Sequence, residues 1–105
     1  MKNKGTPFNI ADSVDYHDGA VVSKIVSSSE GGNVTLFAFD DGQGLSEHTA
    51  PFDALVVVLD GEADVVIAGK KAMLRTGQAV LMPANRPHSL KARKRFKMML
   101  VMTKA

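Results

Sequence analysis

The sequence predicts an all-β protein of one domain, with antiparallel strands arranged as a barrel or a sandwich. Apolar residues alternate with polar ones or form short runs rich in Val, Ile, Leu and Met, and no window of a dozen residues carries an apolar stripe with the period of a helix. Glycine-containing turn signals recur about every 8–12 residues, as they do in all-β barrels and sandwiches. The 105 residues, 45% of them hydrophobic, are enough for one compact core.

Eight segments have the β-branched and apolar composition of strands. In chain order they are residues 21–26, 34–39, 55–59, 63–68, 72–75, 79–82, 89–92 and 96–102. Chain reversals are expected between them at Asp60-Gly61 and Thr76-Gly77, because glycine adopts positive φ without strain. No helical segment lies between these strands, so a parallel α/β sheet is not expected.

The first 18 residues differ in composition from the rest of the chain. Residues 1–18 are polar and irregular, and we predict an N-terminal arm there, either loose or added to the sheet as a short strand. Residues 19–105 contain all the strand candidates. They are the predicted barrel domain.

Composition excludes several classes of protein. The chain has no cysteine, which excludes disulfides, Cys-ligated zinc, iron–sulfur clusters and thiol nucleophiles. The longest apolar run, residues 54–59, falls far short of the roughly 18–20 residues of a membrane-spanning helix. Since no apolar segment follows the basic N-terminus, a secretory signal is not expected either. We therefore expect a cytoplasmic protein without a membrane partner.

The net charge of +2 comes largely from one cluster of cations, Lys91, Arg93, Lys94, Arg95 and Lys97. Such a cluster can attract phosphates, as in nucleic-acid-binding proteins. However, no aromatic residues are interleaved to stack on bases, and the cluster falls between two strand candidates. We predict a solvated hairpin loop and no nucleic-acid partner.

Two stretches of sequence are more specific than the general strand pattern. Residues 42–61 and 77–92 resemble the two motifs of the cupin family, G-x5-H-x-H-x3-E-x6-G and G-x5-P-x-G-x2-H-x3-N. The matches in register are Gly42, His48, Gly61, Gly77, Pro83 and His88. The resemblance implies an antiparallel double-stranded β-helix, the jelly-roll barrel of cupins, with a pocket in its mouth. It also implies a homodimer formed through outer strands and a metal held by three histidines and a glutamate.

Two of the four ligand positions that the resemblance implies carry no donor atom. Ala50 stands at the second histidine position and Ala54 at the glutamate position. Two imidazoles and water would remain for a divalent transition metal, whereas a catalytic zinc uses three protein ligands. Asn85 at a glycine position is a milder change, because asparagine tolerates left-handed backbone geometry.

A third ligand could come from a neighbouring carboxylate. On a regular strand, residues 48, 50, 52 and 54 face inward, so Glu47 and Asp53 face outward. A bulge at Pro51 would shift this parity by one residue and turn Asp53 inward. Asp53 is therefore the one local replacement that the sequence offers.

The pocket is expected to be apolar, with two histidines as its only convergent polar groups. Its predicted lining and ligand-binding residues are His48, His88, Phe39, Phe52, Met82 and Phe96. If the two rings face each other, a second proton is hard to add, because like charges repel in an apolar cavity. His48 and His88 are also the metal-ligand candidates.

Three functions stay open on this basis. The first is binding of a small molecule in the apolar pocket, with at most weak dependence on a metal. The second is a metal-dependent enzyme, a dioxygenase or an isomerase, that uses His48, His88 and the bulge-shifted Asp53. The third is an interaction platform whose pocket is filled by its own side chains.

Overall fold

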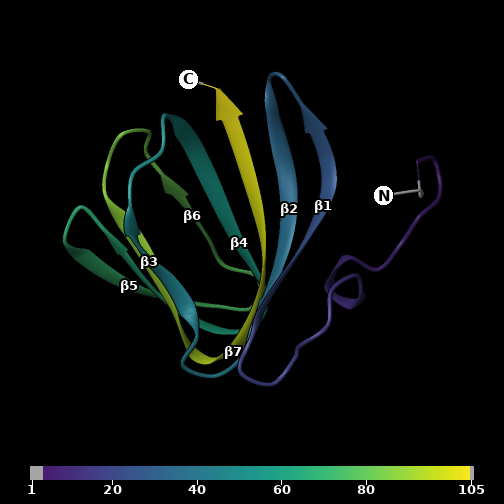
Figure 1. Cartoon of the computed structure of the whole chain (residues 1–105), viewed down its shortest axis with the longest axis horizontal. Coiled ribbons are helices and arrows are strands. Elements are labelled where there is room, and N and C mark those ends of the chain that lie inside the picture. The colour runs from purple at the N-terminus through teal and green to yellow at the C-terminus, as the bar shows by residue number, and fades with distance from the viewer. Residues whose placement is uncertain (1–3, 105) are drawn as a thin grey trace.

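The computed structural model describes residues 4–104 and confirms an all-β antiparallel barrel (Figure 1). A short 3-10 helix, η1, covers Ile10–Asp12, and in this part of the chain no helix is long and apolar enough to cross a membrane. The strands are β1 (Val21–Ser29), β2 (Gly32–Phe39), β3 (Gly44–His48), β4 (Phe52–Ile67), β5 (Lys70–Arg75), β6 (Ala79–Met82) and β7 (His88–Lys104).

Two long strands, β4 and β7, run through both halves of the barrel. The first half of β4 pairs with β6 and with the second half of β7, which in turn pairs with β2. The second half of β4 pairs with β5 and with the first half of β7, which also pairs with β3. Figure 1 shows the two long strands curving from one wall into the other. The interior between these walls is where the functional site lies.

The number of strands predicted from the sequence is wrong in two places. Segments 55–59 and 63–68 are one strand, β4, and segments 89–92 and 96–102 are one strand, β7. Asp60-Gly61 does not reverse the chain but lies at a corner, where the pairing of β4 with β7 shifts register three times between Val58 and Ala63. A glycine can mark a bend of a strand at a barrel corner or the end of a strand. The local sequence signal is the same in the two cases.

The cation cluster is likewise not a hairpin loop. It lies within β7, where Arg93 pairs with Asp64 at 3.7 Å and Lys94 with Glu62 at 3.9 Å. These ion pairs join exposed cations to half-buried carboxylates across neighbouring strands, and such pairs at the surface contribute little to stability. The positive charge is thus partly neutralised along the outer surface of the barrel.

β3 is a strand that the sequence did not predict. The five residues Gly44–His48 follow a glycine turn and only Leu45 among them is half-buried, so they lack the apolar run of a core strand. Their backbone nevertheless pairs with β7, and this pairing places His48 opposite His88. Asn85 has φ of 64°, the left-handed geometry expected at the second motif's glycine position.

The core fills the interior of the barrel and is centred on two stacked aromatic rings. Phe39 and Phe96 are fully buried and their rings stack at a centroid distance of 4.4 Å. In the same cluster are the inward residues of β4, which are small or β-branched, and one leucine of β5: Val56, Val58, Ala63, Val65 and Leu74. Burial of these side chains supplies the main favourable free energy of folding.

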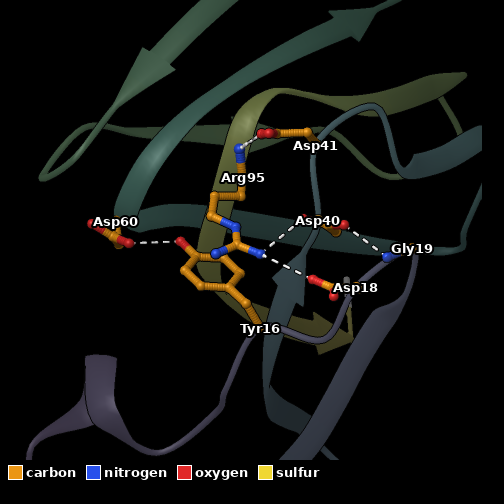
Figure 2. Close-up of polar contacts among 7 residues, drawn as sticks. All are labelled: Tyr16, Asp18, Gly19, Asp40, Asp41, Asp60 and Arg95. Carbon is orange, nitrogen blue, oxygen red and sulfur yellow. Dashed lines mark hydrogen bonds and ion pairs between the residues drawn. The ribbon is translucent and has the colours of Figure 1, made fainter.

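The N-terminal arm adds no strand between residues 4 and 20, and residues 10–16 of it pack against the outside of the barrel. Val14 is 4% exposed and packs with Leu36 and Ala38 of β2 in a second apolar cluster. Figure 2 shows the polar half of this junction, in which the Tyr16 hydroxyl donates to Asp60 Oδ2 at 2.6 Å and the Arg95 guanidinium lies over the Tyr16 ring. Residues 10–16 are therefore part of the folded domain.

Val14→Ala is expected to lower the free energy of unfolding by about 2 kcal/mol. The change removes two buried carbons, worth roughly 0.8 kcal/mol each, and leaves a small cavity under the arm. Urea denaturation of the full chain measures this loss. The matched control is Val21→Ala, because Val21 is 37% exposed and its truncation is expected to change stability by less than about 0.5 kcal/mol. Equal effects of the two changes would contradict the packed arm.

Candidate functional site: the histidine cavity

An enclosed cavity of about 40 Å³ lies inside the barrel beneath the histidine pair. Its wall comes from β3, β4, β6, β7 and the loop before β4. The lining residues are Leu45, His48, Ala50, Ala54, Met82, His88, Leu90, Met98, Leu100 and Met102. Since one water needs roughly 10–15 Å³ of such volume, the cavity has room for about three water-sized atoms.

His48 and His88 meet through their Nε2 atoms, which lie 3.1 Å apart. The Nδ1 atom of His48 is 2.8 Å from the carbonyl oxygen of Ser46, and the Nδ1 atom of His88 is 3.2 Å from that of Arg86. A carbonyl oxygen only accepts hydrogen bonds, so we assign a proton to Nδ1 of each ring. In the neutral form each Nε2 then carries a lone pair, and the two Nε2 atoms lie side by side.

This arrangement leaves the pair in need of a third atom. Two unprotonated Nε2 atoms at this distance have no hydrogen between them, so a shared proton, a metal ion or a donor group of a ligand must satisfy both. The same two rings cross nearly edge to face, at 72°. In the neutral form with both Nδ1 atoms protonated the pair is an acceptor site, whereas one proton shared between the rings satisfies it internally.

The two rings differ in exposure. His88 is only 4% exposed, whereas His48 is exposed to solvent at the edge of the barrel. Burial, and secondarily the charge of His48, hold the pKa of His88 below its usual value.

The lowered pKa of His88 makes stability depend on pH with a definite sign. In the unfolded chain a histidine takes up its proton near pH 6.5, but folded His88 takes it up only at lower pH. The unfolded state therefore binds more protons as the pH falls through this window, and stability decreases. Thermal melts of the wild type are expected to be highest above about pH 6.5 and to fall below it.

Two variants serve as matched comparisons, His88→Gln and His48→Gln. His88→Gln should weaken the dependence of the melting temperature on pH, because it removes the titrating ring. Because the charge of His48 contributes to the lowered pKa of His88, His48→Gln is expected to raise that pKa toward its ordinary value. An NMR titration of the His88 ring measures it directly. An unchanged midpoint in His48→Gln would show that the two rings do not interact.

The positions of the absent motif ligands face this cavity. Ala50 and Ala54 both line it, and Ala54 lies between Met82 and Met102 in the register of the sheet. Asp53 does not line the cavity, and its Oδ1 accepts a hydrogen bond from the backbone nitrogen of Ala84 at 2.9 Å. No bulge turns Asp53 inward.

The donor set fits a divalent metal only in part. Two nitrogens 3.1 Å apart can both bind one ion at about 2.0–2.1 Å, subtending roughly 100° at the metal. Among residues 4–104, however, no cluster of three or more His, Cys, Asp or Glu side chains could hold an ion. When bound, a divalent ion would supply Lewis acidity while His48 and His88 anchor it, but the third protein ligand of a catalytic site is missing.

The structure separates the predicted pocket residues into two groups. Met82 lines the cavity together with the two histidines, whereas Phe39, Phe96 and Phe52 are not among its lining residues. Phe39 and Phe96 belong to the stacked core, and Phe52 lies half-buried at the start of β4. Core packing thus occupies most of the volume that the sequence assigned to a pocket.

Leu45 is a lining residue that the sequence did not indicate. It stands an odd number of positions from His48, so a regular strand would place the two on opposite faces. A register shift between Leu45 and His48 in the pairing of β3 with β7 brings both to the cavity. No proline or glycine marks this irregularity in the sequence, which gave no signal for it.

A larger groove of about 540 Å³ lies on the outer surface over β4, β5 and β7. Its rim carries the exposed Lys71, Lys91 and Arg93 and the half-buried Asp64, and it is open to solvent. Neither histidine borders it. The smaller cavity is the better candidate site, because there a buried histidine, His88, meets a second histidine at an apolar enclosure.

Comparisons with known proteins agree with this geometry. The cupin domain family matches residues 35–103, a span that includes both histidines. A conserved protein of unknown function from Streptococcus pyogenes has a similar structure, with 30% identity, a TM-score of 0.91 and coverage of 95% of this chain and 88% of that one. No curated protein matches the sequence.

Two further solved structures are similar. A cupin 2 conserved barrel domain protein from Leptotrichia buccalis is 39% identical, with a TM-score of 0.89, and the match covers 92% of this chain and 47% of that one. A cupin superfamily protein from Desulfitobacterium hafniense is 27% identical, with a TM-score of 0.90 and coverage of 94% and 91%. Together with the family match over residues 35–103, they show that this chain belongs to the cupin family.

Proposed function

We propose that this cupin is a binding protein whose barrel cavity takes the head group of a small ligand at the His48–His88 pair. The observation that carries the proposal is the pair itself, two Nε2 atoms 3.1 Å apart in a wall that is otherwise apolar. Each Nδ1 is already engaged by a backbone carbonyl, which fixes both rings in orientation. A ligand O–H or N–H group pointing between the rings would satisfy both nitrogens.

The size of the cavity limits the ligand. About 40 Å³ admits a head group of a few atoms, far below the 300–1,000 Å³ of pockets that enclose drug-sized molecules. His48 is exposed, so the opening lies on its side of the pair. The ligand we propose therefore buries a small donor group, with a short apolar body against Leu45 and the methionines.

The donor set favours binding over the metal-dependent dioxygenase or isomerase that the sequence left open. That enzyme needs a third protein ligand, and Asp53, the one local candidate, is bonded to the Ala84 backbone instead. Ala50 and Ala54 offer methyl groups at the remaining positions. A metal held at this pair through nitrogen donors alone would be weakly bound.

The experiment is a titration with primary alcohols from methanol to butanol, monitored by NMR of the full chain carrying ¹³C-methyl methionine. The expected result is a shift of the His88 ring and of the Met82, Met98 and Met102 methyl signals. Met99 and Met73, which lie outside the cavity, are the internal controls. Native mass spectrometry of the protein purified without a histidine tag also tests for a co-purifying ligand.

His48→Phe with His88→Phe fills the space of the rings without their nitrogens and should abolish these shifts. Alcohols that leave the histidine and cavity methyl signals of the wild type unmoved, or move the Met99 signal equally, would contradict the proposal. Such a result would favour the interaction platform, in which the protein's own side chains close the interior.

We also propose that the protein is a homodimer joined at the β1 edge. β1 ends the strand order β1-β2-β7-β4-β5, and Ile25 in its middle is 60% exposed. Unpaired backbone groups beside an exposed apolar side chain favour pairing with another strand edge. Light scattering should give a dimer for the wild type and a monomer for Ile25→Lys, and a monomeric wild type would contradict the proposal.

A further inference from the structure

Three methionines line the cavity, Met82, Met98 and Met102, and two of them neighbour the position where the motif's carboxylate is missing. Met82 is the register partner of Ala54 on β6, and Met102 is its partner on β7. All three residues line the cavity with His48 and His88. The methyl group of Ala54 is thus flanked on both neighbouring strands by a thioether.

The side chains of Met82, Met102 and the two histidines border the same small cavity. Met82 is 1% exposed and Met102 is half-buried, so each thioether is largely shielded from water. The cavity of about 40 Å³ holds one ion and little else. Both histidines line this cavity, and each Nε2 is free to act as a ligand because each Nδ1 donates to a carbonyl oxygen.

The chemistry of this donor set selects a soft ion. Thioether sulfur prefers Cu⁺ and binds Mg²⁺, Ca²⁺ or Mn²⁺ poorly, whereas imidazole nitrogen accepts Cu⁺ as well as Zn²⁺ and Ni²⁺. Cu⁺ carries one charge. In an apolar cavity without a carboxylate, burial of a singly charged ion costs less free energy than burial of a doubly charged ion. In this chain Ala54 stands in place of the motif's glutamate and lies between two methionines. This change shifts the metal preference of the site from divalent ions toward Cu⁺.

We propose that the cavity is a Cu⁺ site, with His48 and His88 as nitrogen ligands and Met82 and Met102 as thioether ligands. The proposal goes beyond the binding function above and needs no organic ligand. Binding involves no change of oxidation state, since the ion enters and leaves as Cu⁺. The alternative role of the two methionines is apolar filling, which leucine performs equally well.

The test is an anaerobic titration of the full, tag-free chain with Cu⁺ against bicinchoninate, beside a titration with Zn²⁺. The expected result is one Cu⁺ per chain, bound more tightly than Zn²⁺. Met82→Leu and Met102→Leu keep the volume and remove the sulfur. Each should weaken Cu⁺ binding at least about tenfold, the scale on which loss of even a supporting group affects a metal site, and leave Zn²⁺ binding within about twofold.

The matched control is Met99→Leu, because Met99 packs with Leu36 and Ala38 outside the cavity. It should bind Cu⁺ as the wild type does, and His48→Gln should abolish Cu⁺ binding. X-ray absorption at the copper edge of the loaded wild type should show both sulfur and nitrogen neighbours, a readout that does not depend on any variant folding.

Three results would overturn the copper site: nitrogen or oxygen neighbours alone around the ion, unchanged Cu⁺ affinity in both Met82→Leu and Met102→Leu, or no Cu⁺ binding by the wild type. None of them touches the proposed ligand function, which the alcohol titration tests separately on metal-free protein. Conversely, a cavity that takes no alcohol but binds Cu⁺ through sulfur would remove the ligand function and leave the copper site standing.

Discussion

Gly61→Ala is expected to lower the free energy of unfolding by about 4 kcal/mol or more, a loss large enough to unfold many domains of this size. Gly61 has φ of 83°, where an L-residue is strained by roughly 1–2 kcal/mol. A Cβ atom there would also lie 1.9 Å from the carbonyl oxygen of Arg95 and 2.8 Å from the Cα atom of Phe96. Backbone atoms cannot give way as the end of a side chain can, so the corner between β4 and β7 must open.

Gly77→Ala is the matched control for this change. Gly77 has φ of 87°, which confirms the positive φ predicted at both glycines, but nothing lies within 4 Å of its added Cβ. Its expected loss is therefore the strain alone, about 1–2 kcal/mol. Chemical denaturation of both variants measures the difference. Equal losses at the two sites would show that β4 and β7 are not in close backbone contact at Gly61.

Ala50→His combined with Ala54→Glu is expected to make folding depend on a divalent metal. Both positions line the cavity with His48 and His88, so the double variant assembles four ligands around one point. Without metal, the new side chains overfill a space of about 40 Å³ and bury a carboxylate at a position now 2% exposed. Overpacking of this kind costs about 1–3 kcal/mol, so the metal-free variant should melt below the wild type.

Addition of Zn²⁺ or Ni²⁺ should then raise the melting temperature of the double variant above that of the wild type. A ligand at 1,000 times its Kd stabilises the folded state by about 4 kcal/mol, which exceeds the overpacking cost. Ala50→Asn with Ala54→Gln is the control, because it adds similar bulk without strong metal donors. Stabilisation of both variants by the metal, or of neither, would contradict the inward placement of these two positions.

Much of the fold follows from short-range sequence signals. Alternation of apolar residues indicated the inward faces of β2, β4 and β7, and the motif spacing placed His48, His88, Ala50 and Ala54 on one enclosure. The corners escaped prediction because a glycine that bends a strand and a glycine that reverses it leave the same local signal. Only the pairing of β4 with β7, residues far apart in sequence, distinguishes the two.

The candidate site was predictable in its histidines but not in its size. Phe39 and Phe96 face inward as expected, yet their stacking closes the space that they were expected to line. Pocket volume depends on how side chains from several strands interdigitate, and one strand's pattern carries no information on that. The position of Leu45 depends likewise on a register shift that only the paired strand reveals.

Tyr16 gives the junction between arm and barrel a spectroscopic signature of its own. It is the one tyrosine in a chain without tryptophan, so the near-ultraviolet absorption and emission of the protein come chiefly from this ring. Burial and the hydrogen bond to Asp60 raise the pKa of its hydroxyl well above the ordinary value. Tyrosine fluorescence and alkaline absorption titration therefore report detachment of the arm, while far-ultraviolet circular dichroism follows the strands independently.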